Sequence, residues 1–415
     1  MISNTFEFVG KITPCKETEN FHPYENIRFP DSDWGKKSIK FNVKCGNNRH
    51  LVEVSQLVNA KNPDSMMIYT FTKGSTSSDG VKTKGEKLEI SFKDRFKQEI
   101  IDKVAEYKKF IIDTELPSRR FHLEKAIDKF KNGTITDEQM TSLGVHSIEE
   151  CEQAFEDSKK KKHEFISAYD FIDYLNKFVN SDKIKNMNFK ITGTYDVEYD
   201  RKNDKWYRHF NVQRIYRQND DVDPISQATF GVVFGREAIR NDNFEETKKA
   251  SIDCYIAQYL NNFKKSFFCP LKLVIDGNGD EKTYKKAVGF VKKFEFPDTT
   301  DCDYREIGVV CTVLNGAQEV EITEDMLTDE QRENLEYGLI TMEDIKAELG
   351  KAVFGDRVTD IVINKLSRNY SKGAVDTAFT DKDFCKPHIE TPKTDNAETL
   401  ETDDEEDIFD EDIDI

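Results

Sequence analysis

Hydrophobic and polar residues alternate along residues 188–199, and this period of two predicts a strand with one buried face. The hydrophobic positions are Phe189, Ile191, Tyr195, Val197 and Tyr199. Residues 200–204 are polar and contain an Asn-Asp pair, which predicts a hairpin loop before a second strand over residues 205–217. Gly193 interrupts the first strand at a point where a small barrel could bend tightly.

The N-terminus repeats this spacing with Phe6, Phe8, Gly10 and Ile12. The tripeptide Phe-Asn-Val also occurs twice, at residues 41–43 and 210–212. Together with a third strand at residues 51–55, the segment resembles the opening of an OB-fold barrel. Two copies of such a barrel are therefore expected, and a twisted antiparallel sheet of another kind is the alternative.

The period of the hydrophobic residues divides the chain into regions. Five short strands before residue 93 match the number that a small barrel requires. A helical period follows, with a capping box at Ser147, and strands then return, with a helix expected near residues 247–263 and a hairpin turn at Asn315-Gly316. The predicted fold class is α+β: two OB-like antiparallel β-barrels with a helical insertion and a disordered acidic tail. The expected parts are an N-terminal OB-like barrel (1–92), a helical region (93–184), a second OB-like α+β domain (185–380) and the tail (381–415).

The net charge of -18 is unevenly spread over the 415 residues. Residues 395–415 contain twelve acidic residues and no basic one, which leaves -6 for the rest of the chain. Because local patches set the field that a polyanion meets, the total charge does not exclude nucleic acid. Eight cysteines without C-x-x-C spacing indicate free thiols in a reducing compartment. No signal peptide or membrane-length apolar run is present, so a cytoplasmic protein is expected, in the host cytoplasm if a phage encodes it.

Enzyme motifs are absent from the sequence. It contains no G-x-x-x-x-G-K-[ST], no G-x-S-x-G and no H-E-x-x-H. Residues 276–280 resemble the start of a calcium loop, but Glu281 and Ala287 stand where that loop needs Gly and a bidentate carboxylate. We therefore expect a non-enzymatic protein without metal or cofactor. An unrecognised carboxylate-dependent, metal-dependent nuclease remains an alternative.

Aromatic and basic side chains are interleaved in the strands, which is typical of surfaces that bind unpaired nucleic acid. Rings stack on bases, and Lys and Arg neutralise phosphates. The expected nucleic-acid-binding residues are Lys40, Lys44, Arg49, Arg201, Lys202, Lys205, Trp206, Tyr207, His209, Arg214 and Arg217. Strict alternation would turn Arg214 inward together with Phe210, unless a β-bulge intervenes. The alternative is a barrel wall with a charged exterior.

The tail has apolar residues spaced through acid: Ile408, Phe409, Ile413 and Ile415. This pattern suits docking into a basic-rimmed apolar pocket on a partner. The same acidity could compete with nucleic acid for the protein's own cationic groove. A merely repulsive tail is the alternative.

With both features, the chain resembles the bacterial and phage single-stranded-DNA-binding proteins, in a divergent phage-type version. That family combines an OB-fold with an acidic C-terminal tail that recruits replication and repair enzymes. The resemblance covers residues 1–92, 185–370 and 395–415, although this tail ends Asp-Ile-Asp-Ile instead of Pro-Phe. It implies a protein that binds single-stranded DNA in replication or recombination and contacts other proteins of those processes through its tail, with no membrane partner. A phage structural or protein-interaction protein is the second alternative.

Overall fold

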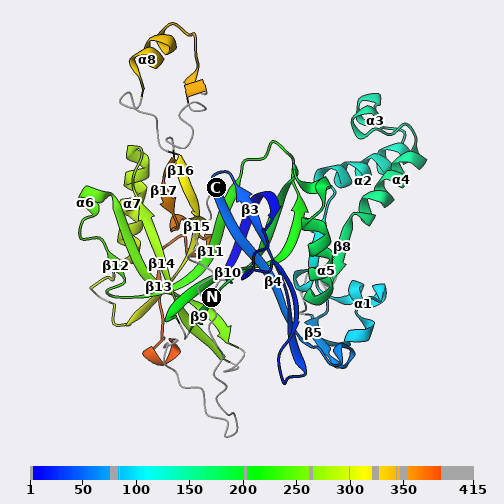
Figure 1. Ribbon diagram of the computed structural model, residues 1–415, viewed down its shortest axis with the longest axis horizontal. Helices are drawn as coiled ribbons and strands as arrows, with labels where there is room; N and C mark the ends of the chain where they lie inside the picture. Colours follow the sequence, from blue (N-terminus) through cyan, green and yellow to red (C-terminus); the bar gives the residue numbers. More distant parts are fainter. Residues whose placement is uncertain are drawn as a thin grey trace.

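The computed structural model describes residues 3–74, 83, 85–200, 203–260, 265–298, 300–319, 327–342, 344–345 and 354–384 (Figure 1). The strands are β1 (Thr5–Pro14), β2 (Tyr24–Arg28), β3 (Trp34–Cys45), β4 (Asn48–Asn59), β5 (Met67–Phe71), β6 (Lys87–Ser91), β7 (Phe110–Asp113), β8 (Lys162–Phe165), β9 (Asn188–Asp200), β10 (Lys205–Arg217), β11 (Ile225–Gly235), β12 (Ile239–Arg240), β13 (Lys249–Leu260), β14 (Lys265–Asp276), β15 (Tyr304–Val313), β16 (Gly316–Glu319), β17 (Phe354–Val358), β18 (Ile361–Leu366) and β19 (Val375–Asp376). The α-helices are α1 (Gln98–Lys103), α2 (Pro117–Lys131), α3 (Asp137–Leu143), α4 (Ile148–Lys160), α5 (Ala168–Val179), α6 (Phe244–Thr247), α7 (Glu281–Phe294) and α8 (Asp329–Glu336). The α+β class is confirmed, and most strands join one large sheet.

Five strands of the first half pair into a closed cycle, which we call ring 1. β1 pairs antiparallel with β3, β3 with β4, β10 with β9, and β9 with β1. The parallel pairing of β4 with β10 closes the cycle. α5, which lies between β4 and β9 in the chain, packs against β3 and β4.

Five later strands repeat this order, and we call them ring 2. β11 pairs antiparallel with β13, β13 with β14, β18 with β15, and β15 with β11. β14 and β18 are parallel, as β4 and β10 are in ring 1. α7 lies between β14 and β15 in the chain and packs against β14, so it corresponds to α5.

The composition of ring 1 differs from the expected barrel within residues 1–92. β5 and β6, which were expected to complete that barrel, form a two-stranded sheet of their own. β9 and β10 complete ring 1 instead, because Tyr195 and Phe210 fill its interior, with ring centroids 5.3 Å apart. These strands were expected to open a separate domain at residue 185. β1 and β9 are adjacent, with Phe8 opposite Ile191, so their similar spacing is not a repeat of two barrels.

Two local predictions were wrong for identifiable reasons. Residues 249–260 form β13 and not a helix, because Ala250, Ile252, Cys254 and Ile256 are buried with the period of a strand. Asn315-Gly316 does not turn β15 back on β16, since β16 pairs with β17. The Asn315 amide instead donates to the carbonyl of Arg49 at 2.7 Å, and this bond attaches the segment to ring 1.

The two rings share an interface and one hydrophobic core. The first half of β1 pairs with β11, and Phe6 lies opposite Ala228. The Gln258 side chain of ring 2 also donates to the carbonyl of Val197 and accepts from its N–H, both at 2.8 Å. These contacts join the rings side by side.

Two buried polar groups support ring 1. His50 stacks on Phe8 with 4.2 Å between ring centroids, and its Nε2 is 2.6 Å from the Ser226 hydroxyl. Burial lowers the pKa of His50 to about 4. On the α5 side, the Lys37 ammonium is 2.6 Å from Asp173, and its side chain is only 2% exposed.

The helical insertion confirms the helix predicted after Ser147, whose hydroxyl accepts from the N–H of Glu150. α2, α3 and α4 enclose a small cluster of their own around Leu123 and Cys151. Figure 1 shows these three helices at the side of the molecule away from ring 2.

Candidate nucleic-acid interface

The outward face of β3 carries lysines at alternate positions. Ile39, Phe41 and Val43 are buried inside ring 1, so the side chains between them point outward. Outward positions of β1, β3 and β4 form what we call the cationic face: Lys11, Lys36, Lys40, Lys44 and Arg49.

Three cations of this face lie in one cross-strand row. Lys11 is opposite Lys44, and Lys44 is opposite Arg49. All three side chains are exposed, and none forms an ion pair among the described residues. Like charges directly opposite one another destabilise a sheet. The row therefore costs the fold free energy, which indicates a role other than stability.

Glu53 is the acidic residue nearest the middle of the face, and its charge is balanced. It lies opposite Lys40 and hydrogen-bonds to Nδ1 of His209. Burial lowers the pKa of His209, but the hydrogen bond and charge of Glu53 outweigh burial, and the pKa is raised. Burial raises the pKa of Glu53, but the same hydrogen bond together with nearby cations lowers it overall. The ion pair leaves the field of the other cations largely unopposed.

Apolar side chains lie at the far end of the same face. Trp34, on the outward side of β3, is 49% exposed, and Leu57, opposite Lys36, is 60% exposed. Ile27 of β2 flanks Lys36 on its other side and is 46% exposed. The exposed ring of Trp34 beside these cations suits a chain of phosphates and unpaired bases.

The residues of β10 that were expected to bind nucleic acid are less accessible to a ligand. Arg217 bonds to Asp220 at 3.0 Å, and its side chain is 13% exposed. Trp206 packs against the core and lies 5.1 Å from the Tyr199 ring. Arg214 points outward because a bulge between Val212 and Arg214 shifts the register. Its guanidinium donates to a backbone carbonyl of the helical region at 2.9 Å.

The structure thus brings Lys40, Lys44 and Arg49 onto one face, with His209 beside them. Lys205 is exposed and Tyr207 half-buried on the β9–β10 hairpin. Arg201, Lys202 and the four apolar tail residues lie outside the described residues. The sequence-based prediction missed Lys11, Lys36 and Trp34. The even spacing of Trp34, Lys36, Lys40 and Lys44, which places all four on one face of a strand, was the available signal.

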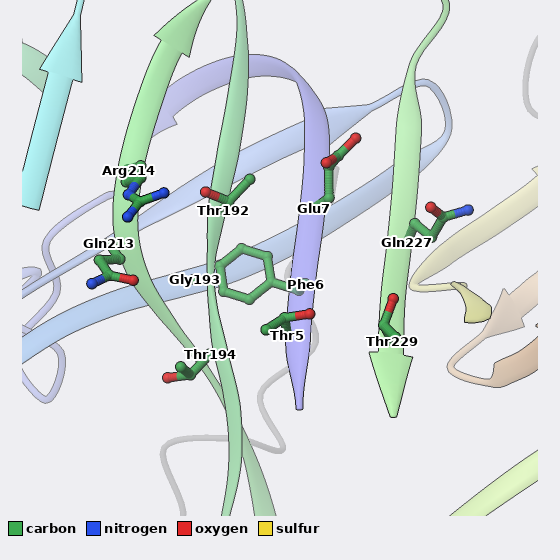
Figure 2. A pocket seen from close by; sticks show the side chains of 10 residues that line it. All are labelled: Thr5, Phe6, Glu7, Thr192, Gly193, Thr194, Gln213, Arg214, Gln227 and Thr229. Carbon is green, nitrogen blue, oxygen red and sulfur yellow. The ribbon is translucent and has the colours of Figure 1, made fainter. Parts of the chain in front are cut away.

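A shallow polar hollow lies where the rings meet (Figure 2). Its lining comes from β1, β9, β10 and β11 and consists of Thr5, Phe6, Glu7, Thr192, Gly193, Thr194, Gln213, Arg214, Gln227 and Thr229. Figure 2 shows the Phe6 ring beside Gly193, which has no side chain to cover it. A Cβ at Gly193 would lie 1.9 Å from the carbonyl oxygen of Asn211, so only glycine fits this close approach.

Among the described residues, no group of three or more His, Cys, Asp or Glu side chains is arranged to hold a metal ion. No helix in the described part of the chain is both long and apolar enough to cross a membrane.

Comparison with known proteins gave a structural similarity but no match in sequence. No protein-family model and no curated protein matches the chain. A deletion mutant of the single-stranded DNA binding protein from Thermus aquaticus aligns over 75% of this chain and 86% of its own, with 8% identity and a TM-score of 0.27. At that identity and score, the similarity assigns no role to any residue of this chain.

Proposed function

We propose that this protein binds single-stranded DNA, with the cationic face of ring 1 as its principal contact surface. The row of Lys11, Lys44 and Arg49 carries the proposal, because three unpaired like charges side by side are explained by a polyanion that lies across them. Trp34 extends this surface with a ring that can stack on a base, worth about 1–3 kcal/mol.

The strand order supports the choice of ligand. We interpret both rings as OB-type barrels, because each has five strands, a parallel closing pair and a helix before its fourth strand. In OB-folds, the face of the second and third strands binds oligonucleotides, together with adjacent loops. In ring 1 those strands are β3 and β4, which carry most of the cationic face.

The acidic tail completes the proposed function. A tail with Ile408, Phe409, Ile413 and Ile415 spaced through carboxylates suits docking to replication or recombination proteins, or competition for the cationic face. We propose a binding protein and not an enzyme, with no cofactor.

Fluorescence anisotropy of labelled oligo-dT in a salt series tests the proposal. We expect length-dependent binding that weakens with salt, and Trp34→Ala should weaken it about five- to 150-fold. Trp206→Ala is the matched control, because that ring packs against the core and should change affinity less. No binding at low salt would leave a protein-interaction role, and Mg²⁺-dependent cleavage of the oligonucleotide would indicate a nuclease.

A further inference from the structure

The last described residues lie against ring 2. β19 pairs with β15, and the next residue, Thr377, donates its N–H and its hydroxyl to the carbonyl of Tyr304 at 3.2 and 2.7 Å. Phe384 then forms a parallel bridge with Phe268 of β14. Figure 1 shows this orange end of the described chain beside β13 and β14.

Phe384 is inserted among three aromatic rings, which we call the aromatic pocket: Tyr255, Phe268 and Tyr304. Its ring centroid is 4.4 Å from Tyr304 at an interplanar angle of 32°. It is 4.6 Å from Tyr255 at 70°, so one ring lies against its face and another at its edge. Phe384 is 7% exposed as a result.

The aromatic pocket lies on the outward side of ring 2. Cys269, Leu271 and Leu273 point into the core, so Phe268 points outward by the period of the strand. Phe268 is nevertheless only 5% exposed, and it packs against Phe384 and Phe379. Without the segment from Thr377 to Phe384, an aromatic surface would face solvent.

This surface partly overlaps, in ring 2, the place that the cationic face has in ring 1, since Tyr255 lies on β13 and Phe268 on β14, whereas Tyr304 lies on β15. β13 and β14 are the second and third strands of their ring, as β3 and β4 are of theirs. One ring therefore presents this face with cations and exposed apolar residues, whereas the other covers it with its own chain.

We propose that the aromatic pocket is a second base-stacking site and that Phe384 occupies it until single-stranded nucleic acid displaces the segment. The proposal rests on the proposed function. A base and the phenyl ring both present a flat aromatic face, and each would use the face of Tyr304 and the edge of Tyr255, so they compete for one position. Release breaks only a short stretch of strand pairing, because β19 has two residues, together with the bonds of Thr377 and the ring contacts of Phe379 and Phe384.

This competition differs from that of an acidic tail. The contacts of Phe384 with the aromatic pocket are between uncharged rings, so salt does not screen them. A carboxylate-rich tail competes through charge and loses its effect as salt rises. The two devices are therefore separable in one titration series.

The first test is oligo-dT affinity of the full chain carrying Phe384→Ala. We expect about three- to tenfold tighter binding than wild type at both low and high salt. Adding Tyr255→Ala should remove the gain. Phe121→Ala is the matched control, because Phe121 is a phenylalanine 54% exposed on α2, and its loss should leave affinity unchanged.

The second test uses the unaltered protein, so that instability of the variant cannot obscure the result. Hydrogen exchange of the Thr377 amide, which bonds to Tyr304, should accelerate when oligo-dT saturates the protein. Binding with unchanged exchange there and unchanged affinity in Phe384→Ala would overturn the second site while leaving ring 1 binding intact. Failure of wild type to bind at low salt would refute the proposed function itself.

Discussion

Lys44 lies between two other cations, so neutralising it should strengthen the fold and weaken DNA binding at the same time. Directly opposite residues have Cβ atoms about 5 Å apart, and charges about 7 Å apart in water repel by about 0.6 kcal/mol. Lys44→Gln removes two such repulsions, with Lys11 and Arg49, and should raise the free energy of unfolding by about 1 kcal/mol at low salt. Added salt should reduce this increase in the free energy of unfolding, because it screens the repulsions that the variant removes.

The binding effect of Lys44→Gln follows from counterion release. Each phosphate contact on a single strand contributes about -0.7 to the slope of log K against log salt. Between 50 and 200 mM salt, wild type should therefore lose roughly threefold more affinity than the variant. Urea unfolding and oligo-dT anisotropy measure the two effects, with Lys125→Gln on α2 as a control of equal charge change. Lower stability, or an unchanged salt slope, would refute the role assigned to the row.

Three further predictions concern stability. The pKa of His50 is lowered to about 4 in the fold, so the free energy of unfolding should fall by about 3 kcal/mol as the pH drops from about 6.5 to 4. His50→Leu should flatten this pH dependence, which the urea midpoint measures. Lys37→Ala should cost about 2 kcal/mol, because it removes a buried ammonium and its ion pair with the half-exposed Asp173. Lys36→Ala on the outward face should cost little in the same urea titration. Gly193→Ala should destabilise the fold by about 1–3 kcal/mol, because the added methyl group would clash with the carbonyl of Asn211. Gly289→Ala in α7, which has open space around it, should instead stabilise the fold by about 0.5–1 kcal/mol. Thermal melts measure both effects.

Local periodicity predicted strands well where one face is buried. The alternation around Phe189 placed β9 correctly, because inward and outward positions differ sharply there. The prediction of a helix over β13 was wrong, because polar outward residues such as Ser251 and Asp253 obscured the apolar and small residues of the buried face.

Pairing was the part that local sequence did not determine. Nothing in the sequence near β4 indicates that its parallel neighbour lies beyond the helical insertion, so the domain boundary at residue 185 was placed within a single ring. The residues of the candidate site were mispredicted for the same reason, because strand pairing decides which side chains share a face. Lys11 belongs to the cationic face only because β1 pairs with β3 and places it opposite Lys44. Arg217 was expected to bind nucleic acid, but it forms a local ion pair with Asp220.

The long interruption of ring 1 also has a consequence for biosynthesis. β1, β3 and β4 emerge from the ribosome first, but β9 and β10 follow only after roughly 130 more residues, which takes on the order of ten seconds at usual translation rates. During that interval the edges of β1 and β4 have no neighbour, and the nascent chain presents open strands that can pair with another molecule. Folding of this protein in the cell should therefore depend on chaperone protection of its N-terminal hairpin until the chain past Arg217 has been made.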